Sequence, residues 1–299
     1  MYNNLNWEKT KDGTARLLGV NDMPGELVLP EKIEGLPLTE VGPYCFAKNK
    51  YLERVVLPDS LIKMERMAFY NCTGLKELEI GAALTELGGD AFMNCHNLSM
   101  LKVRCDVKET TCARLVLRQI SSDLTVHFLG KGHQQEAIIL FPEYYESYDE
   151  VTPAHLFGRN IEGEGFRARQ FFKDGIFEYA RYDGIFQKAC AEERETTLCE
   201  MAMNRLRYPV ELSESAREQY AEYVRSHVNL ICEKAVYNRD RNILEFLCKN
   251  NLMTKKDVDD CVRMAAEREW IEGGAYILQL KARYFIEDSK AKRYEFDDF

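Results

Sequence analysis

Residues 57–80 read LPDSLIKMERMAFYNCTGLKELEI, and residues 80–103 read IGAALTELGGDAFMNCHNLSMLKV. When the two stretches are aligned, Phe69 lies over Phe92 and Leu75 lies over Leu98, each pair 23 residues apart. A constant interval in the twenties is typical of a solenoid, in which each copy forms one coil and buries its apolar side chains against its neighbours.

The same interval runs through three copies. Five apolar columns carry it: Val41, Met64 and Leu87; Phe46, Phe69 and Phe92; Leu52, Leu75 and Leu98; Val55, Leu78 and Leu101; Leu57, Ile80 and Val103. Each copy contains the pattern L-x-x-L-x-L, whose last residues alternate apolar and variable, as in a short strand with one face inward. We therefore expect parallel strands on one face of the solenoid, with a degenerate fourth copy at Leu124 and Val126.

These repeats resemble the BspA-type leucine-rich repeat. The segments GTARLLGV at 13–20 and LVLPEKIEGLPLTEVGPYCF at 27–46 resemble the start of such an array, so the similarity covers residues 12–128. The resemblance implies a leucine-rich-repeat solenoid, a bacterial origin and a habit of binding proteins. Many members of the family are exported surface proteins, but Met1–Trp7 lacks the basic and apolar pattern of a signal peptide. We therefore expect a cytoplasmic protein.

The composition is typical of a soluble globular chain, with 45% hydrophobic and 30% charged residues. A net charge of −9 argues against a nucleic-acid partner, because phosphate binding requires clustered Lys and Arg. The apolar run at 137–141 is far shorter than the roughly 20 residues of a membrane-spanning helix. Neither a nucleic-acid nor a membrane partner is expected.

The second half has a different pattern. Residues 141–186 are dense in aromatic residues and predict a connector that packs the end of the solenoid against later helices. Beyond about Glu192 the apolar spacing becomes helical: Pro209 ends one helix, Ser215 and Glu218 form a capping box for the next, and Thr254 caps another. A stripe of Tyr220, Val224, His227, Ile231 and Ala235 predicts one continuous helix, and further elements are expected to end at Asn251 and to run from Trp270 toward Tyr284.

Residues 242–283 are similar to ankyrin-type helix pairs, although the turn motif of that family is missing. The predicted fold class is α+β multidomain: a leucine-rich-repeat solenoid with 23-residue coils, followed by an all-α array of short helix pairs. The predicted divisions are 1–130 for the solenoid, 131–190 for the connector, 191–286 for the helical domain and 287–299 for a charged flexible tail.

No catalytic motif is present, and we expect no enzymatic activity, cofactor or metal. Ser60 and Lys63 fit the spacing of a Ser/Lys dyad, but they occupy repeat positions and lack any companion motif. Cys95 and His96 are sequence neighbours, a spacing that does not by itself form a zinc site. Cys72 lies one coil from Cys95, so a disulfide is geometrically possible, but two thiols filling a buried column are the favoured interpretation.

Two groups of residues are candidates for binding. Arg167, Arg169 and Arg181 lie near Gly163-Glu164-Gly165, where backbone amides beside arginines could hold an anion; arginines stacked on aromatic rings are the structural alternative. The second group consists of two outward columns of the predicted strands: Arg54, Glu77, Met100 and Asp123, and Val56, Glu79, Lys102 and Thr125.

The outward charges have two interpretations. Arg54 beside Glu77, and Glu79 beside Lys102, could pair along the sheet and leave little net field. Alternatively the face binds a partner, and Val56 and Met100 are the apolar positions at which to look for the contact. We predict a non-catalytic adaptor or scaffold that binds an unknown protein through this face. The alternatives are a small-molecule or anion sensor with its site in the connector, and a surface adhesin, which a Cys72–Cys95 disulfide would favour.

Overall fold

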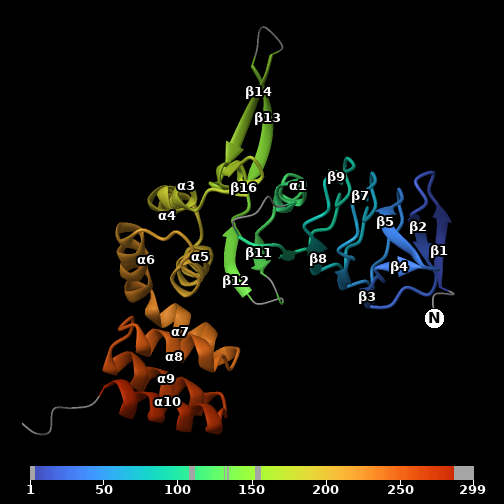
Figure 1. The fold of residues 1–299 in the computed structure, drawn as a ribbon. Coiled ribbons are helices and arrows are strands. Elements are labelled where there is room, and N and C mark those ends of the chain that lie inside the picture. The colour runs from blue at the N-terminus through green and yellow to red at the C-terminus, as the bar shows by residue number, and fades with distance from the viewer. Residues whose placement is uncertain (1–3, 108–111, 131, 133–134, 152–155, 286–299) are drawn as a thin grey trace, which may run out of the picture. The chain divides into compact units, whose positions relative to one another are not determined.

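A computed structural model of the chain describes residues 4–107, 112–130, 132, 135–151 and 156–285. The chain forms two compact units, Met1–Ala216 and Arg217–Phe299, and each is described by itself (Figure 1). The predicted divisions at 130/131 and 190/191 stay predictions, and the predicted tail at 287–299 lies outside the described residues.

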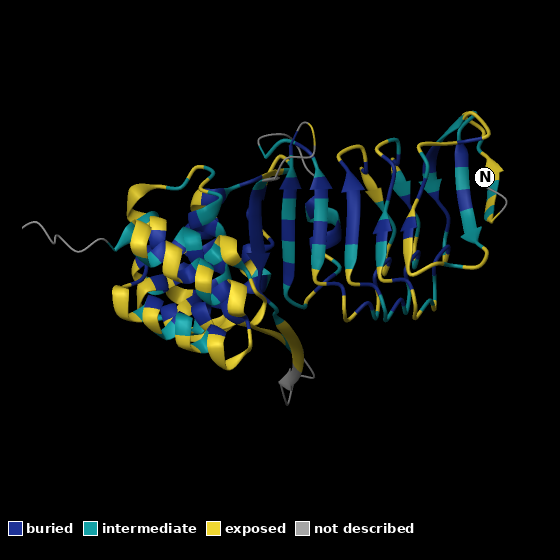
Figure 2. Ribbon diagram, turned by 90° about the horizontal axis from the view of Figure 1, so that it is seen from below, coloured by how far each residue is buried: buried dark blue, intermediate teal, exposed yellow. Residues whose placement is uncertain are grey.

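The repeats of the first unit form the predicted parallel sheet. Its order is β12-β11-β10-β8-β6-β3, and every pair is parallel except β11 with β12. The strands are β3 (Glu26–Val28), β6 (Arg54–Val56), β8 (Glu77–Gly81), β10 (Met100–Arg104), β11 (Leu124–Leu129) and β12 (Gln135–Phe141). Buried and half-buried residues alternate along β10 and β11 (Figure 2), as strands with one inward face require.

A second ladder runs through the same coils, where only one sheet was expected. Its order is β1-β2-β5-β7-β9, with β4 pairing to β5. The strands are β1 (Leu5–Lys9), β2 (Ala15–Val20), β4 (Lys32–Ile33), β5 (Leu36–Val41), β7 (Lys63–Met64) and β9 (Glu86–Leu87). The column of Val41, Met64 and Leu87 forms part of it, in register across β5, β7 and β9. Two-residue strands carry too little alternation to be recognised from a sequence.

The aromatic column fills the interior of the coils. Phe46, Phe69 and Phe92 are at most 2% exposed, and their rings stack with centroids 4.6 Å and 5.4 Å apart. Leu52, Leu75 and Leu98 are fully buried in the neighbouring column. Each coil therefore supplies half of two hydrophobic interfaces, which confirms the stacking that the interval of 23 residues predicted.

Each coil also turns through left-handed backbone at two matched positions. Lys48, Asn71 and Asn94 share one of them, with φ of 64°, 58° and 63°. Asparagine tolerates this conformation better than lysine. The side chains of the two asparagines also join across the coils, because Asn94 Nδ2 donates to Asn71 Oδ1 at 2.6 Å.

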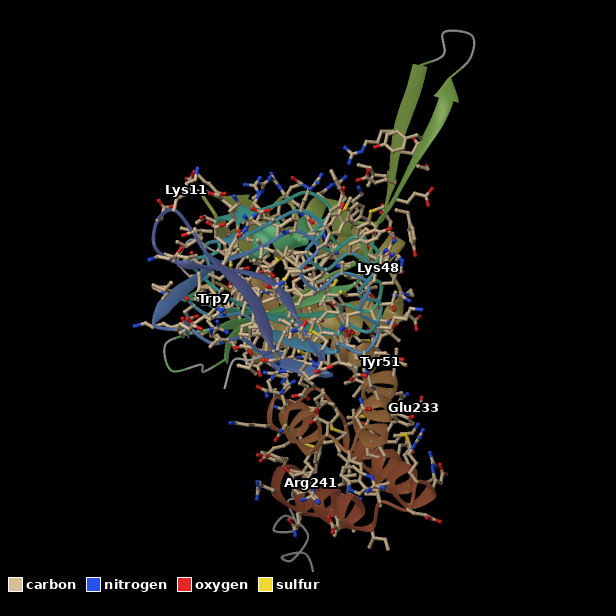
Figure 3. The ribbon with its side chains drawn as sticks, turned by 90° about the vertical axis from the view of Figure 1, so that its right-hand side faces the viewer. Trp7, Lys11, Lys48, Tyr51, Glu233 and Arg241 are labelled. Atoms are coloured by element: carbon tan, nitrogen blue, oxygen red, sulfur yellow. The ribbon has the colours of Figure 1, made fainter. Side chains whose placement is uncertain are left out.

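Replacing Lys48 with Asn should therefore stabilise the first unit by about 0.5–1 kcal/mol. Lys48 is exposed at the surface of the solenoid (Figure 3), so little packing is lost. Chemical denaturation followed by circular dichroism measures the change. Lys50→Asn is the matched control, because Lys50 is exposed but has no positive φ. An equal gain from both variants would mean that lost charge, and not backbone strain, is the cause.

Different groups end the two ladders of the solenoid. After β10 the chain forms α1 (Ala113–Leu117) in place of another coil turn, so Leu115, predicted to continue the phenylalanine column, is only half-buried. The Gln119 amide then substitutes for the next peptide group: its Oε1 accepts from Ala91 N at 2.7 Å, and its Nε2 donates to Gly88 O at 2.8 Å. Backbone groups that the next coil would have paired are satisfied in this way.

At the end of the main sheet, β12 is buried on both faces by the aromatic segment. Phe141 contacts Phe172, Phe177 and Tyr182, with ring centroids 6.5, 5.5 and 6.1 Å away. The Tyr182 hydroxyl donates to Leu140 O at 2.6 Å, and α5 (Glu195–Arg207) packs against β12. The connector thus packs the end of the solenoid against a following helix, as its composition predicted.

The rest of the first unit consists of short elements. They are the hairpin β13 (Tyr145–Val151) and β14 (Leu156–Glu162), the hairpin β15 (Phe172–Lys173) and β16 (Ile176–Phe177), α2 (Gly165–Ala168), α3 (Tyr179–Gly184) and α4 (Phe186–Glu192). Strands β13 and β14 pair only with each other among the described strands, and they project from the body of the unit (Figures 1 and 3).

The second unit is a stack of helices. α6 (Glu214–Ser226) leads into it, followed by α7 (Val228–Tyr237), α8 (Arg241–Lys249), α9 (Lys255–Glu267) and α10 (Ile271–Tyr284). α7 contacts α8, α9 contacts α10, and the pairs stack through α7 with α9 and α8 with α10. The short helix pairs are confirmed, whereas the ankyrin-type similarity stays a prediction.

The two pairs are related by a shift of 30 residues that the sequence analysis missed. Ala235 O accepts from Asp240 N, and Ala265 O accepts from Trp270 N, both at 2.8 Å. Arg239 and Glu269, one position before these donors, each have φ of 54°. The turn geometry repeats while the side chains differ, so matching residue types could not reveal it.

Local helix signals were partly correct. Thr254 caps α9 in a capping box with Asp257, and Asn251 has the left-handed φ of 53° expected at a helix end. The predicted capping box of Ser215 and Glu218 is wrong, because α6 begins at Glu214 and its first turn is capped by Ser213, whose Oγ accepts from Ala216 N at 3.2 Å. The predicted continuous stripe is also interrupted: His227 separates α6 from α7.

Candidate functional site

The strand face is the outward side of β3, β6, β8, β10 and β11. Up to β10 the structure places its residues as predicted: Glu77 lies between Arg54 and Met100, and Glu79 lies between Val56 and Lys102. At β11 the register shifts by two residues. Thr125 is opposite Met100, and His127 is opposite Lys102, so the predicted places of Asp123 and Thr125 in these columns are wrong. The insertion of α1 lengthens the last interval from 23 to 25 residues.

Asp123 instead lies before β11 and helps to hold the connector. Its Oδ1 accepts from Glu143 N at 2.7 Å, and its Oδ2 contacts Arg194 Nη2 at 2.8 Å. Arg194 also reaches Glu143 Oε1 at 3.3 Å. This carboxylate therefore belongs to the closing structure of the solenoid and not to a column of the strand face.

The charges on the strand face pair with one another. Arg54 contacts Glu77 at 2.9 Å and Glu79 at 3.4 Å, and Lys102 contacts Glu77 at 2.7 Å. The predicted contact of Arg54 with Glu77 is present. Glu79 lies beside Lys102 in register, but its ion-pair partners are Arg54 and Arg104.

Arg104 is the residue of this network that the sequence analysis missed. Its side chain is only 9% exposed, and it contacts Asp59 and Glu79, both at 2.7 Å. It also donates to Leu57 O. The alternation of Met100 and Lys102 continues to Arg104, so the same rule that selected the first two residues would have selected the third.

The network changes the acidity of its central carboxylate. Burial raises the pKa of Glu77, but hydrogen bonds and charge from Lys102 and Arg54 outweigh burial, so the net pKa is lowered. Because the folded pKa lies below the unfolded value, the stabilising effect is complete above the unfolded pKa and is lost as the pH falls through the folded pKa. At neutral pH the face is thus a set of satisfied ion pairs.

Apolar side chains are most exposed near the first coils. Val28 is 65% exposed and lies in register with Val56, which is half-buried. Met100 is also half-buried, two strands beyond β6. These three side chains are the apolar part of the strand face available to a partner.

The three arginines of the predicted anion site have separate partners. Arg169 is 1% exposed; it donates to Gly165 O at 2.9 Å, to Ser122 O at 2.7 Å and to Pro142 O. Its guanidinium lies over the rings of Phe141 and Tyr144, and burial lowers its pKa to about 10. This is the structural role weighed against anion binding.

The other two arginines lie on the surface beside carboxylates. Arg167 contacts Glu164 at 3.2 Å, and Arg181 contacts Glu178 at 2.8 Å. Arg181 also lies over the Phe171 ring, 4.7 Å from its centroid. Each guanidinium is thus neutralised locally.

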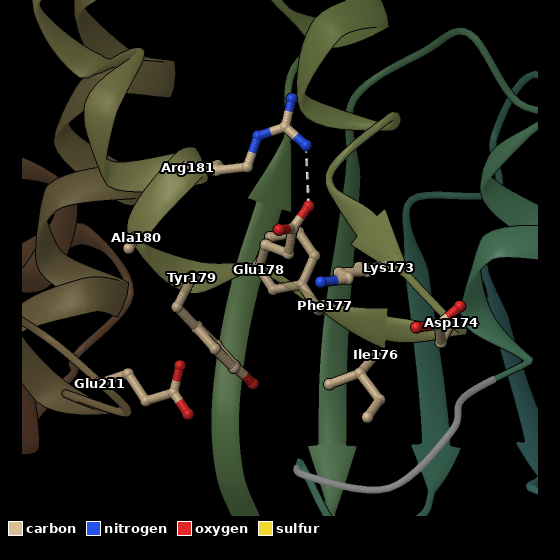
Figure 4. A pocket seen from close by; sticks show the side chains of 9 residues that line it. All are labelled: Lys173, Asp174, Ile176, Phe177, Glu178, Tyr179, Ala180, Arg181 and Glu211. Atoms are coloured by element: carbon tan, nitrogen blue, oxygen red, sulfur yellow. Dashed lines mark hydrogen bonds and ion pairs between the residues drawn. The ribbon is translucent and has the colours of Figure 1, made fainter.

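A pocket of about 390 Å³ lies in the connector (Figure 4). Its lining combines charged and aromatic residues: Lys173, Asp174, Ile176, Phe177, Glu178, Tyr179, Ala180, Arg181 and Glu211. Of the three predicted arginines only Arg181 reaches it. Tyr179 is 1% exposed, its hydroxyl has no hydrogen-bond partner, and burial raises its pKa.

The two cysteines considered for a disulfide are free and buried. Cys72 Sγ donates to Phe46 O, and Cys95 Sγ donates to Phe69 O, each at 3.0 Å. Burial raises the pKa of Cys72 to about 11 and that of Cys95 to about 12, so both are thiols at neutral pH. They fill a column of the coil interior.

Two further searches concern the described part of the chain alone. Within it, no three His, Cys, Asp or Glu side chains gather as metal ligands would. None of its helices has the length and apolar character needed to cross a membrane.

Comparisons with known proteins agree with the repeat pattern. Residues 33–113 match a family model described as the BspA type leucine rich repeat region, in 6 copies. No curated protein matches the chain.

Solved structures also match. A leucine-rich repeat protein from Bacteroides capillosus is 24% identical, over 34% of this chain and 79% of that protein, with a TM-score of 0.32. A leucine rich cell surface protein from Faecalibacterium prausnitzii is 22% identical, over 34% of this chain and 36% of that protein, with a TM-score of 0.29. The leucine rich repeat protein of T. pallidum is 22% identical, over 35% of this chain and 70% of that protein, with a TM-score of 0.24. From the family match and the columns together, residues 33–113 are a leucine-rich repeat region of the BspA type.

Proposed function

We propose that the chain is a non-catalytic adaptor or scaffold that binds a partner protein through the strand face. Leucine-rich repeat proteins are in general protein-interaction modules. The observation that carries the proposal is the exposed apolar pair Val28 and Val56 beside a network of satisfied ion pairs.

The chemistry of this face defines the kind of partner that it fits. Its cations and carboxylates already neutralise one another, so it offers little field to attract a strongly charged ligand. An apolar centre with a polar surround is the usual anatomy of a protein interface. The partner should accordingly present an apolar side chain to Val28 and Val56, with polar groups around it.

The test compares two variants as baits in a pull-down from the source organism. Val28→Glu with Val56→Thr removes the apolar pair and keeps a β-branched residue in β6. Ile62→Glu with Met93→Thr is the matched control, because Ile62 and Met93 are exposed apolar residues, at 45% and 46%, outside the strand face.

A protein retained by the wild type and the control, but lost by the strand-face variant, is the expected result. Circular dichroism must show that both variants are folded. If every bait retained the same proteins, or the control alone lost one, the strand face would not be the binding surface.

A small-molecule site in the connector is the second candidate. The pocket there and the unpartnered hydroxyl of Tyr179 support it. The predicted arginines do not, because Arg167, Arg169 and Arg181 each have partners of their own.

A further inference from the structure

The solvent-facing side of α10 has no charged residue. Ile271, Ala275, Leu278 and Ala282 recur at steps of three and four residues, so they share one face of the helix. All four are exposed, Ile271 at 85% and Leu278 at 52%. Gly274 and Gln279, which flank this stripe, are also uncharged.

This face differs from those of the neighbouring helices. The exposed positions of α8 and α9 are mostly charged: Arg241, Lys249, Lys255, Lys256, Asp259, Arg263 and Glu267. α10 is the outermost helix of the second unit (Figure 1). The end of a helical stack needs a polar outer surface when it faces water. An apolar stripe in this position indicates a covered surface.

We propose that this face of α10 binds the same face of a second copy of the chain, with the two helices antiparallel. A two-fold axis at Leu278 brings that residue against itself. It also sets Ile271 opposite Phe285 of the second copy, and the pair Gly274 and Ala275 opposite Ala282. Large residues meet at the centre and ends, while small residues between them allow the helices to approach closely.

The charges beside the stripe select this orientation. Glu272 lies in the first turn of α10, and Lys281 and Arg283 lie in its last turn. Antiparallel pairing brings Glu272 toward Arg283 of the second copy and also opposes the two helix dipoles favourably. Parallel pairing would instead place like charges together. The side chains of Glu272 and Arg283 are 85% and 60% exposed, so their contacts with Arg241 and Glu245 leave room for a second partner.

The expected dimer is weak. One helix of 14 residues offers less surface than the roughly 800 Å² per partner of a typical stable interface. We therefore expect an equilibrium between monomer and dimer that shifts with micromolar concentration. This inference concerns the second unit and does not depend on a partner at the strand face.

Sedimentation equilibrium of the full chain, from about 5 to about 500 µM, is the test. Leu278→Glu places two carboxylates against each other at the axis and should lower the association constant at least about tenfold. Tyr237→Glu is the matched control: Tyr237 is 70% exposed and apolar but lies on α7. It should associate as the wild type does.

A mixture of two variants tests the symmetry. Leu278→Glu and Leu278→Lys should each remain monomeric, whereas an equimolar mixture should associate, because opposite charges then meet at the axis. A mixture that stays monomeric would overturn the antiparallel arrangement about Leu278. A wild type that is monomeric throughout would overturn the proposal and mean that something other than a second copy covers the stripe. Association of Leu278→Glu as strong as that of the wild type would place the contact elsewhere.

Discussion

Phe69→Ala should lower the free energy of unfolding of the first unit by about 3–5 kcal/mol. Phe69 is fully buried, and its ring stacks on Phe46 from one side and Phe92 from the other. Removing it opens a cavity that touches three consecutive coils. Because each coil of a solenoid is stabilised only by its neighbours, the loss weakens two interfaces at once.

Urea denaturation followed by circular dichroism measures this loss. Tyr51→Ala is the control, since Tyr51 is an aromatic residue of the same array that is 81% exposed. We expect the control to change stability by less than about 0.5 kcal/mol. Equal losses from the two variants would show that the stacked column does not hold the coils together.

Asp183→Ala should destabilise the first unit by a similar amount, about 3–5 kcal/mol, because it leaves a buried charge unpaired. Arg205 is completely buried on α5, and its guanidinium donates to both carboxylate oxygens of Asp183 on α3, at 2.7 and 2.8 Å. It also donates to Val210 O at 2.9 Å and lies over the Tyr179 ring. Removing the carboxylate removes the only negative partner in this bidentate contact.

The double variant Asp183→Leu with Arg205→Met separates charge from packing. Replacing a buried ion pair by apolar residues of similar volume is often neutral or stabilising, so the double variant should be much more stable than Asp183→Ala. Thermal unfolding of the three proteins in one buffer gives the comparison. A double variant as unstable as Asp183→Ala would mean that the hydrogen bonds to the backbone, and not the unpaired charge, dominate.

The sequence predicted the solenoid because its information is periodic. Phe46, Phe69 and Phe92 occupy equivalent places in successive coils, so one interval fixes both the stacking and the register from β6 to β10. The prediction failed at β11, where Met100 lies opposite Thr125 and not Asp123. Once α1 replaces a coil turn, counting by 23 no longer follows the backbone.

The candidate site was predicted in part for the same reason. Side chains on adjacent strands meet when the register is known, so the contact of Arg54 with Glu77 followed from spacing. Contacts across two or more coils did not. Arg104 reaches Asp59, 45 residues earlier, and Arg169 reaches Ser122 O, 47 residues earlier. No local pattern encodes those distances.

The amino-acid sequence by itself determined the repeat, the strands of the main sheet, the buried columns and the capping box of α9, because each depends on residues at short or constant separation. Only the tertiary structure decided the second ladder, the end of the array at Gln119, the burial of Arg169 and Arg205, and the uncharged outer face of α10. These features depend on which distant segments pack together, and packing free energy is summed over the whole unit and not over a window of sequence.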